Sequence, residues 1–363
     1  MYKVTIRPHW EITQGREAPL DMATLLALLM SVQDTGSISQ AARSVGWSYR
    51  YAWGLLREVE KLFAVALIQT DRGRGTKLTP MAEKLIWADR RIAARLSPLL
   101  ESLASELEVE LGKILTGQAR LVRLEASHGF AVAAMMTHLN SANISIDLRY
   151  RNSTDAVAAL SRRECDLAGF HVPIGEFEKP AIARYMQWLN PKEHCLIHLA
   201  IRNQGLFVAP GNPHAIVGVA DLVRNDVRFV NRQAGSGTRM MLELMLAAAG
   251  IDKEKINGYE SAEFTHSAIA AYIASDMADV GIGVQTAAHR FGLDFIPVVR
   301  ERYFLAVSIA ALEDPQVQQV IDVLQSDAFR DAVDGLAGYD ASDMGTLISL
   351  PEAFGLTDVD KTD

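Results

Sequence analysis

Hydroxyl and glycine residues gather at three places in the second half of the sequence, each after an apolar stretch and before a helical one. They are Ser127-His128-Gly129 after LVRLEA, Asn152-Ser153-Thr154 after IDLRY, and Gly235-Ser236-Gly237-Thr238-Arg239 after VRFVNR. Helix N-termini carry unpaired N–H groups and partial positive charge, and small residues let an anion approach them. Ser and Thr also cap helices without any ligand. Three such junctions in one domain, however, predict an anion-binding site.

A fourth junction adds polar residues of the same kind. Thr265 and His266 open the helical stretch that follows FTHS, where His266 is either a ligand contact or a polar cap. The residues expected to bind the ligand are therefore Ser127, His128, Ser153, Thr154, Gly235, Ser236, Gly237, Thr238, Arg239, Thr265 and His266.

Metal and nucleophile chemistry find little support in the same residues. His128, His171 and His266 have no Cys or His nearby at the spacing of metal ligands. Ser127 and His128 are adjacent rather than opposed, and no GxSxG motif occurs. The sequence predicts no metal site, no catalytic residue and no resident cofactor.

The N-terminal quarter predicts a helix-turn-helix. Asp21 precedes one apolar helix that Gly36 closes, and Ser37 with Gln40 forms a capping box for a short second helix. Ser48 caps a third helix, whose apolar residues recur on one face through Phe63. In this motif the N-terminal residues of the second of two linked helices face the DNA bases.

Polar and aromatic residues at the start of that helix are candidates for DNA contacts, although Trp53 could equally be a core residue. Residues 67–80 then predict a two-stranded wing with a Gly- and Arg-rich tip. Hydroxyl and basic side chains suit phosphates and base edges. The residues expected to bind DNA are Ser37, Gln40, Ser48, Tyr49, Arg50, Trp53, Arg57, Arg72, Arg74 and Lys77.

A long helix follows from residue 81 to about residue 112. Its leucines step by three, four or seven residues, so we expect it to pair with its copy in a homodimer or higher homo-oligomer. Pro98 lies inside it and predicts a kink or an interruption.

Composition and charge agree with this division. The chain has 363 residues, of which 49% are hydrophobic, and a net charge of −8, yet residues 36–95 hold 11 Lys/Arg against 5 Asp/Glu. A basic module on an acidic body is expected when one part meets phosphates, and an ordinary charged helical surface is the alternative that charge alone leaves open. The start of the chain lacks a signal-like apolar run and no membrane-spanning stretch occurs, so we expect a cytoplasmic protein. The two cysteines, Cys165 and Cys195, lie in apolar segments typical of reduced, buried thiols.

Residues 20–95 resemble the winged helix-turn-helix of molybdate-responsive regulators of the ModE type, close relatives of the LysR-type domain. The matching segments are GSISQAA, SYRYAW, the Gly- and Arg-rich wing and LTP. This resemblance implies a dimer that binds an inverted repeat in double-stranded DNA. The rest of the chain alternates strands and helices and predicts parallel strands, unlike the small β-barrels that follow this module in ModE-type proteins.

Residues 119–345 resemble instead the two-lobed periplasmic-binding-protein fold, in the branch of molybdate-binding-like domains fused to regulators. The resemblance rests on EASH, DLAGFHVP, RNQGLFVAPGNP, FVNRQAGSGTR, ADVGIG and GLDFIPVVRERYFL. It implies an oxyanion site in a cleft between two lobes, with Ser127, Ser153 and the Ser236–Thr238 loop as its donors. Gly129 stands where the resemblance predicts an acidic residue.

The expected architecture is α/β overall. We expect a winged helix-turn-helix over residues 1–80, a linker and dimerisation helix over 81–118, a two-lobed periplasmic-binding-protein-like domain over 119–350 and a tail over 351–363. The predicted function is a transcriptional regulator that senses a small anion, molybdate or tungstate by resemblance. Formate, another carboxylate, sulfate or a pterin-type cofactor are the alternative effectors, and an enzyme acting on a small anion is the alternative class.

Overall fold

The computed structural model describes residues 3–15, 19–71, 75–116 and 121–356. It divides into two compact units, residues 7–94 and residues 1–6 with 95–363. We describe each unit by itself.

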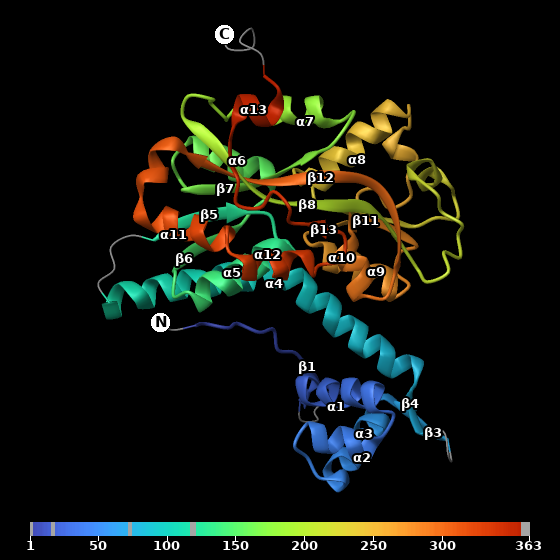
Figure 1. The fold of residues 1–363 in the computed structure, drawn as a ribbon. Coiled ribbons are helices and arrows are strands. Elements are labelled where there is room, and N and C mark those ends of the chain that lie inside the picture. Colours follow the sequence, from blue (N-terminus) through green and yellow to red (C-terminus); the bar gives the residue numbers. More distant parts are fainter. Residues whose placement is uncertain (1–2, 16–18, 72–74, 117–120, 357–363) are drawn as a thin grey trace. The chain divides into compact units, whose positions relative to one another are not determined.

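The N-terminal unit is a small helical domain with a β-ribbon (Figure 1). Asp21 caps its first helix by accepting a hydrogen bond from the backbone of Ala23, and Gly36 ends that helix in the left-handed conformation, as predicted. Apolar residues from the three helices, among them Leu25, Ala41 and Leu56, form its core. Its elements are β1 (Glu11–Ile12), β2 (Leu20–Asp21), α1 (Met22–Thr35), α2 (Ile38–Ser44), α3 (Tyr49–Phe63), β3 (Ile68–Asp71) and β4 (Gly75–Leu78).

Helix α4 (Pro80–Thr116) is 37 residues long and begins in this unit. Of the two outcomes predicted at Pro98, the interruption is wrong, because the helix continues through this residue, and the kink stays a prediction. A proline removes one backbone donor, and the part of α4 after Pro98 is held by strand β6 (Ile146–Tyr150). Ser105 Oγ donates to the Ile146 carbonyl at 3.1 Å, and the Tyr150 amide donates to Ser102 Oγ at 3.1 Å.

The C-terminal unit contains a ten-stranded sheet. Its central strands are the long β8 (His194–Val208) and β12 (Asp294–Ser308), which pair with each other antiparallel. Along the sheet the order is β10 (Ala262–Glu263), β9 (Phe229–Arg232), β11 (Val280–Val284), β8, β12, β7 (Leu167–Pro173), β5 (Val122–Ala126) and β6, while β13 (Tyr339–Asp340) and β14 (Leu347–Ser349) also pair with β8.

Parallel pairing holds within each half of the sheet but not across its middle. Strand β5 pairs parallel with β6 and β7, and β9 pairs parallel with β10 and β11. The two long strands are antiparallel to their neighbours, which corrects the expectation of parallel strands. The physical reason is that the chain crosses from one half of the sheet to the other along β8 and crosses back along β12, so these two strands run in opposite directions.

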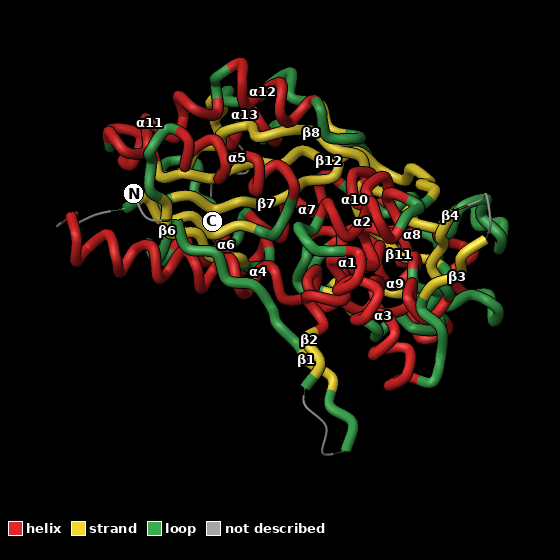
Figure 2. The backbone as a smooth tube through the Cα atoms, turned by 90° about the horizontal axis from the view of Figure 1, so that it is seen from below, coloured by secondary structure: helices red, strands yellow, loops and turns green. Residues whose placement is uncertain are grey.

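Helices cover both faces of the sheet, as Figures 1 and 2 show. In the half that we call lobe one, α5 (Phe130–Ser141), α11 (Pro315–Leu324) and α12 (Asp327–Asp334) pack on one face, and α6 (Ser153–Ser161), α7 (Glu178–Tyr185) and α13 (Leu350–Phe354) pack on the other. In lobe two, α8 (Gly237–Ala248) lies on one face and α9 (His266–Ala274) with α10 (Gln285–Arg290) on the opposite one. Three short 3-10 helices complete the unit: η1 (Val219–Val223), η2 (Lys253–Lys255) and η3 (Ile309–Glu313).

Candidate functional site

The carboxyl ends of the two parallel half-sheets meet in the middle of β8. Pro173, which ends β7, pairs with Glu301 of β12, and Glu301 pairs with Arg202 of β8. Val284, which ends β11, pairs with Gln204 of β8. Ligands in open α/β sheets bind beyond the carboxyl ends of strands. The register therefore places the candidate site around Arg202 and Gln204.

Lobe one and lobe two touch at the N-termini of two helices. Ser153 begins α6, and its hydroxyl lies 3.4 Å from Nδ1 of His171 on β7. Gly237 begins α8, and a Cβ there would lie 3.5 Å from Cβ of His171, 3.6 Å from Oγ of Ser153 and 3.8 Å from the hydroxyl of Tyr185. The start of α8 in lobe two thus rests on polar side chains of lobe one.

Two arginines supply positive charge to this place, and both are buried. Arg202 donates to Glu301 at 2.5 Å and is paired. Arg232, at the end of β9, donates instead to the backbone carbonyls of Glu263, at 3.1 Å, and Phe264. Burial, followed by the charge of Arg202, lowers the pKa of Arg232. Because a guanidinium stays protonated at neutral pH, this buried charge favours an incoming anion.

Two histidines beside the arginines are neutral. Burial, and then the charges of Arg202 and Arg232, hold the pKa of His171 well below its ordinary value. Burial and the same two arginines lower the pKa of His266, the first residue of α9. Gly283 leaves room for this ring, since a Cβ there would lie 2.7 Å from Nδ1 of His266. Neutral imidazoles add hydrogen-bonding groups without further charge.

Several buried polar atoms here lack a well-oriented hydrogen-bond partner within the described part of the chain. The atoms are His171 Nε2, Tyr185 Oη, Gln204 Oε1, Arg232 Nε, His266 Nδ1 and Tyr303 Oη. Unpartnered buried polar groups are costly, and a cluster of them marks a place where a ligand can supply the missing bonds. We call these six residues with Ser153, Gly237 and Arg202 the central cluster.

The structure brings some of the predicted ligand residues into or beside the central cluster. Ser153, Gly237 and His266 belong to it. Ser127 is buried beside the hydroxyl of Tyr303, whose ring centroid lies 3.8 Å from that of His171. Thr238 accepts a hydrogen bond from Gln204 at 2.9 Å.

Two predicted hydroxyls are used as helix caps. Ser236 accepts from the backbone of Arg239 and donates to the Gln233 carbonyl at 2.9 Å, and Thr265 accepts from the backbone of Ala268. These bonds fix the starts of α8 and α9, so both residues orient backbone N–H groups rather than present a free hydroxyl.

Other predicted ligand residues face elsewhere. The Arg239 guanidinium forms ion pairs with Glu243 and Glu260 and lies 4.6 Å from the ring centre of Tyr259. His128 lies 3.7 Å from Glu101 of α4. Gly235 packs on Asn152, and Thr154 is half-buried in α6.

Sequence reasoning missed Tyr185, Arg202, Gln204, Arg232 and Tyr303, and it weighed His171 only as a metal ligand. One signal was present. Charged or amide residues interrupt otherwise apolar strands in RNQG and VNRQ, and a charged residue inside a buried strand needs a partner or a function. Among the described residues, no group of three or more His, Cys, Asp and Glu could hold a metal ion.

In the N-terminal unit, the structure confirms Ser37 and Ser48 as helix caps and confirms the ribbon, but the capping box predicted for Ser37 and Gln40 is not completed, because the Ser37 amide donates to Thr35 Oγ1 at 3.4 Å. Ser37 accepts from the backbone of Gln40 at 3.4 Å, and Ser48 accepts from the backbone of Tyr51 at 3.2 Å. Strands β3 and β4 pair antiparallel as the wing. Arg72 and Arg74 lie outside the described residues, and Lys77 on β4 is exposed.

The first turns of α3 present aromatic and basic side chains. Tyr49 is 52% exposed, and Arg50 is exposed beside it. Trp53 is half-buried, and its ring lies between that of Tyr49, 6.1 Å away and nearly parallel, and the guanidinium of Arg57 at 4.5 Å. Trp53 thus lies at the edge of the core, where it also orders two exposed side chains.

Family comparisons agree with both halves of the geometry. The family described as "PBP superfamily domain" matches residues 134–325, more than half of the chain. The chain belongs to the PBP superfamily. The family "Bacterial regulatory helix-turn-helix protein, lysR family" matches residues 23–83. This PBP-superfamily chain is therefore a DNA-binding LysR-type transcriptional regulator with an effector-binding domain.

Three relatives illustrate the similarity. The uncharacterized protein YvgK of Bacillus subtilis is 33% identical over 215 residues, which is 58% of this chain and 68% of YvgK. The molybdenum-pterin-binding protein MopB of Rhodobacter capsulatus is 31% identical over 39% of this chain and 53% of MopB. The molybdenum transport protein ModE of Herbaspirillum seropedicae is 42% identical over 19% of this chain and 27% of ModE. None of the helices described in the regulator is long and apolar enough to cross a membrane.

Proposed function

We propose that this LysR-type regulator binds a small anion at the central cluster and that the bound anion changes its affinity for DNA. One observation carries the proposal. Arg232 is buried, its Nε is unpartnered, and its guanidinium donates to carbonyls rather than to a carboxylate. An anion would balance this charge and accept hydrogen bonds from donors of both lobes.

Molybdate or tungstate is the effector that we propose. The support is the resemblance of both domains to molybdate-responsive proteins and the similarity of the chain to the molybdenum-pterin-binding protein MopB and the molybdenum transport protein ModE. The described residues of the central cluster also suit such an ion, since arginine, imidazole, hydroxyl and helix N–H groups can surround a tetrahedral oxyanion. Sulfate, formate, another carboxylate and a pterin-type cofactor remain the competing effectors.

DNA binding is assigned to the start of α3 and to the wing. The exposed Arg50 and Tyr49 lie at the positions from which a helix-turn-helix contacts base edges, and Lys77 is assigned to the DNA backbone beside the groove. Ser37, Gln40, Ser48, Trp53 and Arg57 then orient the two helices or contact phosphates. Arg72 and Arg74 keep their proposed role at the wing tip on sequence grounds alone.

A homodimer through α4 completes the proposal. Leucines of α4 at positions 96, 99, 103, 107 and 111 are 37–58% exposed, although their spacing places them on one stripe. Such a stripe of leucines is the seam of paired helices. A second copy of α4 would bury this leucine stripe. The resulting dimer would present two DNA-binding units to an inverted repeat.

Selection of bound duplexes from a random library by the purified protein, with molybdate and without it, tests this function. We expect an inverted repeat whose affinity differs between the two conditions. The Arg50→Ala variant should lose about 1–3 kcal/mol of specific affinity and keep its response to molybdate. Lys61→Ala, at the exposed far end of α3, is the control. Identical affinities with and without molybdate, tungstate, sulfate and formate would refute the regulator assignment for these anions.

A further inference from the structure

Glu263 connects Arg232 of the central cluster to helix α4. Glu263 is the last residue of β10 and pairs in register with Arg232 of β9. Its carbonyl accepts hydrogen bonds from the Arg232 guanidinium and from the Gln233 amide, both at 3.1 Å. Its carboxylate, only 3% exposed, lies 3.0 Å from the guanidinium of Arg95 on α4. The same residue thus touches an anion-binding candidate with its backbone and α4 with its side chain.

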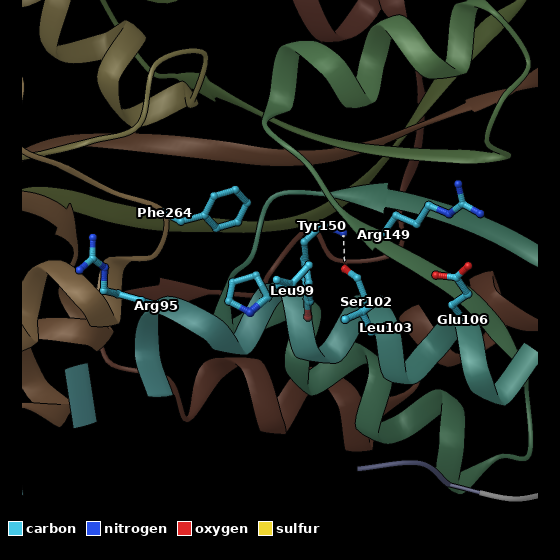
Figure 3. Close-up of a pocket in the computed structure, with 9 residues that line it drawn as sticks. Arg95, Leu99, Ser102, Leu103, Glu106, Arg149, Tyr150 and Phe264 are labelled. Carbon is cyan, nitrogen blue, oxygen red and sulfur yellow. Dashed lines mark hydrogen bonds between the residues drawn. The ribbon is translucent and has the colours of Figure 1, made fainter. Parts of the chain in front are cut away.

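Figure 3 shows a groove along α4, and Arg95, the partner of Glu263, marks one end of it. Arg95 and Phe264 stand at that end, Arg149 and Glu106 stand at the other, and Leu99 lies between them. Arg149 is 55% exposed and its pair is Asp147, at 3.5 Å. Arg149 therefore offers a comparison for Arg95, which is similarly exposed and lines the same groove but contacts Glu263.

The charges around Glu263 determine whether its contact with Arg95 favours or opposes anion binding. The negative charge of Glu263 acts on Arg232 and partly compensates it. An anion that binds Arg232 brings a second negative charge close to Glu263 in a buried region, where like charges repel strongly. Arg95 would then offset this repulsion, because its guanidinium contacts the Glu263 carboxylate.

Helix α4 can carry the effect onward. Arg95 directly follows Ala94, the last residue of the N-terminal unit, and α4 runs without interruption from Pro80 to Thr116. A change in how firmly Glu263 holds Arg95 therefore acts on a helix that continues into the DNA-binding unit.

We propose that Glu263 is a positioning residue that couples the anion site to α4, so that anion binding at Arg232 tightens the Glu263–Arg95 ion pair. This inference rests on the proposed function, because it requires an anion at Arg232. The proposal fixes the effect of each side chain on anion affinity. The negative charge of Glu263 lowers the affinity, and Arg95 raises it by offsetting that charge.

Calorimetric titration of the full chain with molybdate tests the sign. We expect Glu263→Gln to tighten molybdate binding and Arg95→Ala to weaken it, each by roughly threefold to tenfold for a partly screened charge. In the Glu263→Gln background, Arg95→Ala should change little. The control Arg149→Ala should match the wild type. Thermal unfolding of each variant verifies that it is folded.

Hydrogen exchange adds a readout on the helix itself. In the wild type, molybdate should slow amide exchange near residues 261–268 and also in residues 96–107 of α4, whereas in Glu263→Gln only the first effect should persist. The coupling through Glu263 would be overturned, and the anion site kept, by either of two results. In one, Arg95→Ala weakens molybdate binding equally in the wild type and in Glu263→Gln. In the other, the slower exchange in α4 persists in Glu263→Gln. A wild-type protein that binds no molybdate would overturn the proposed molybdate site together with this inference.

Discussion

Tyr185 and Ser153 are neutral hydroxyl groups at the centre of the proposed anion site. Both are fully buried, and both lie under the first residue of α8. Burial raises the pKa of the Tyr185 hydroxyl above its ordinary value, so it stays protonated and can donate to an anion. A neutral donor of this kind stabilises an oxyanion without changing the net charge of the site.

Tyr185→Phe removes this donor and keeps the ring. We expect molybdate affinity to fall roughly threefold to tenfold, the usual effect of one lost neutral hydrogen bond, while DNA binding without anion stays unchanged. Tyr259→Phe, which removes another buried hydroxyl that donates to Glu243 at 3.3 Å, should leave the affinity unaltered. Equal losses in the two variants would show that Tyr185 acts through stability alone.

His171 and His266 make the stability of the protein depend on pH. Their pKa values lie below the ordinary 6.5 because burial, with the two arginines, disfavours protonation. The unfolded chain therefore binds more protons than the folded one as the pH falls below about 6.5. We expect the free energy of unfolding, measured in urea, to decrease as the pH falls below about 6.5 and to level off once the pH is below the pKa of the folded histidines.

Histidine substitutions identify the groups responsible for this decrease. His171→Asn should show a smaller loss of stability on acidification than the wild type, whereas His289→Asn, at an exposed position, should follow the wild type. If the free energy of unfolding of His171→Asn falls with decreasing pH as steeply as that of the wild type, other groups cause the acid sensitivity.

At the scale of elements, much of the N-terminal unit follows from the sequence because its signals are local. Ser37, Ser48 and Gly36 mark helix ends within a few residues of themselves, and the apolar residues of α3 recur along a single helix. The central cluster depends instead on pairing between distant segments. Arg202 meets Glu301 only because β8 and β12 pair these two residues, between two register shifts along the strands, and no local pattern determines that register.

Helix α4 carries the most direct prediction at this scale. Leu107→Glu places a charge on the leucine stripe, where Leu107 is 43% exposed. If two copies pair there, the buried charge should dissociate the dimer, which sedimentation or light scattering measures as a halved mass. Val65→Glu changes an apolar residue of similar exposure, 48%, outside the stripe and should leave the mass unchanged. Dimers in both variants would place the contact elsewhere.

At the scale of the whole molecule, the proposed mechanism needs only differential affinity. Donors of the central cluster come from both lobes, so an anion favours the arrangement in which the lobes meet, and that preference can bias the DNA-binding state. The two-part architecture was predictable from the helix caps and wing pattern of the N-terminal module, from the alternation of strands and helices in the rest of the chain, and from the resemblance of each part to a known family. The sequence did not distinguish Arg239, whose buried guanidinium pairs with Glu243 and Glu260, from Arg232, whose buried guanidinium donates to backbone carbonyls, because both lie in the one segment VNRQAGSGTR.

Isothermal titration of the oxyanion-stripped protein with molybdate, tungstate, sulfate and formate in one buffer tests the central claim most directly. The proposed site predicts saturable binding of molybdate or tungstate and rejection of sulfate. Binding of sulfate or formate instead would keep the anion site and replace its proposed effector. The absence of binding by all four anions would contradict the claim that the central cluster senses one of these ions.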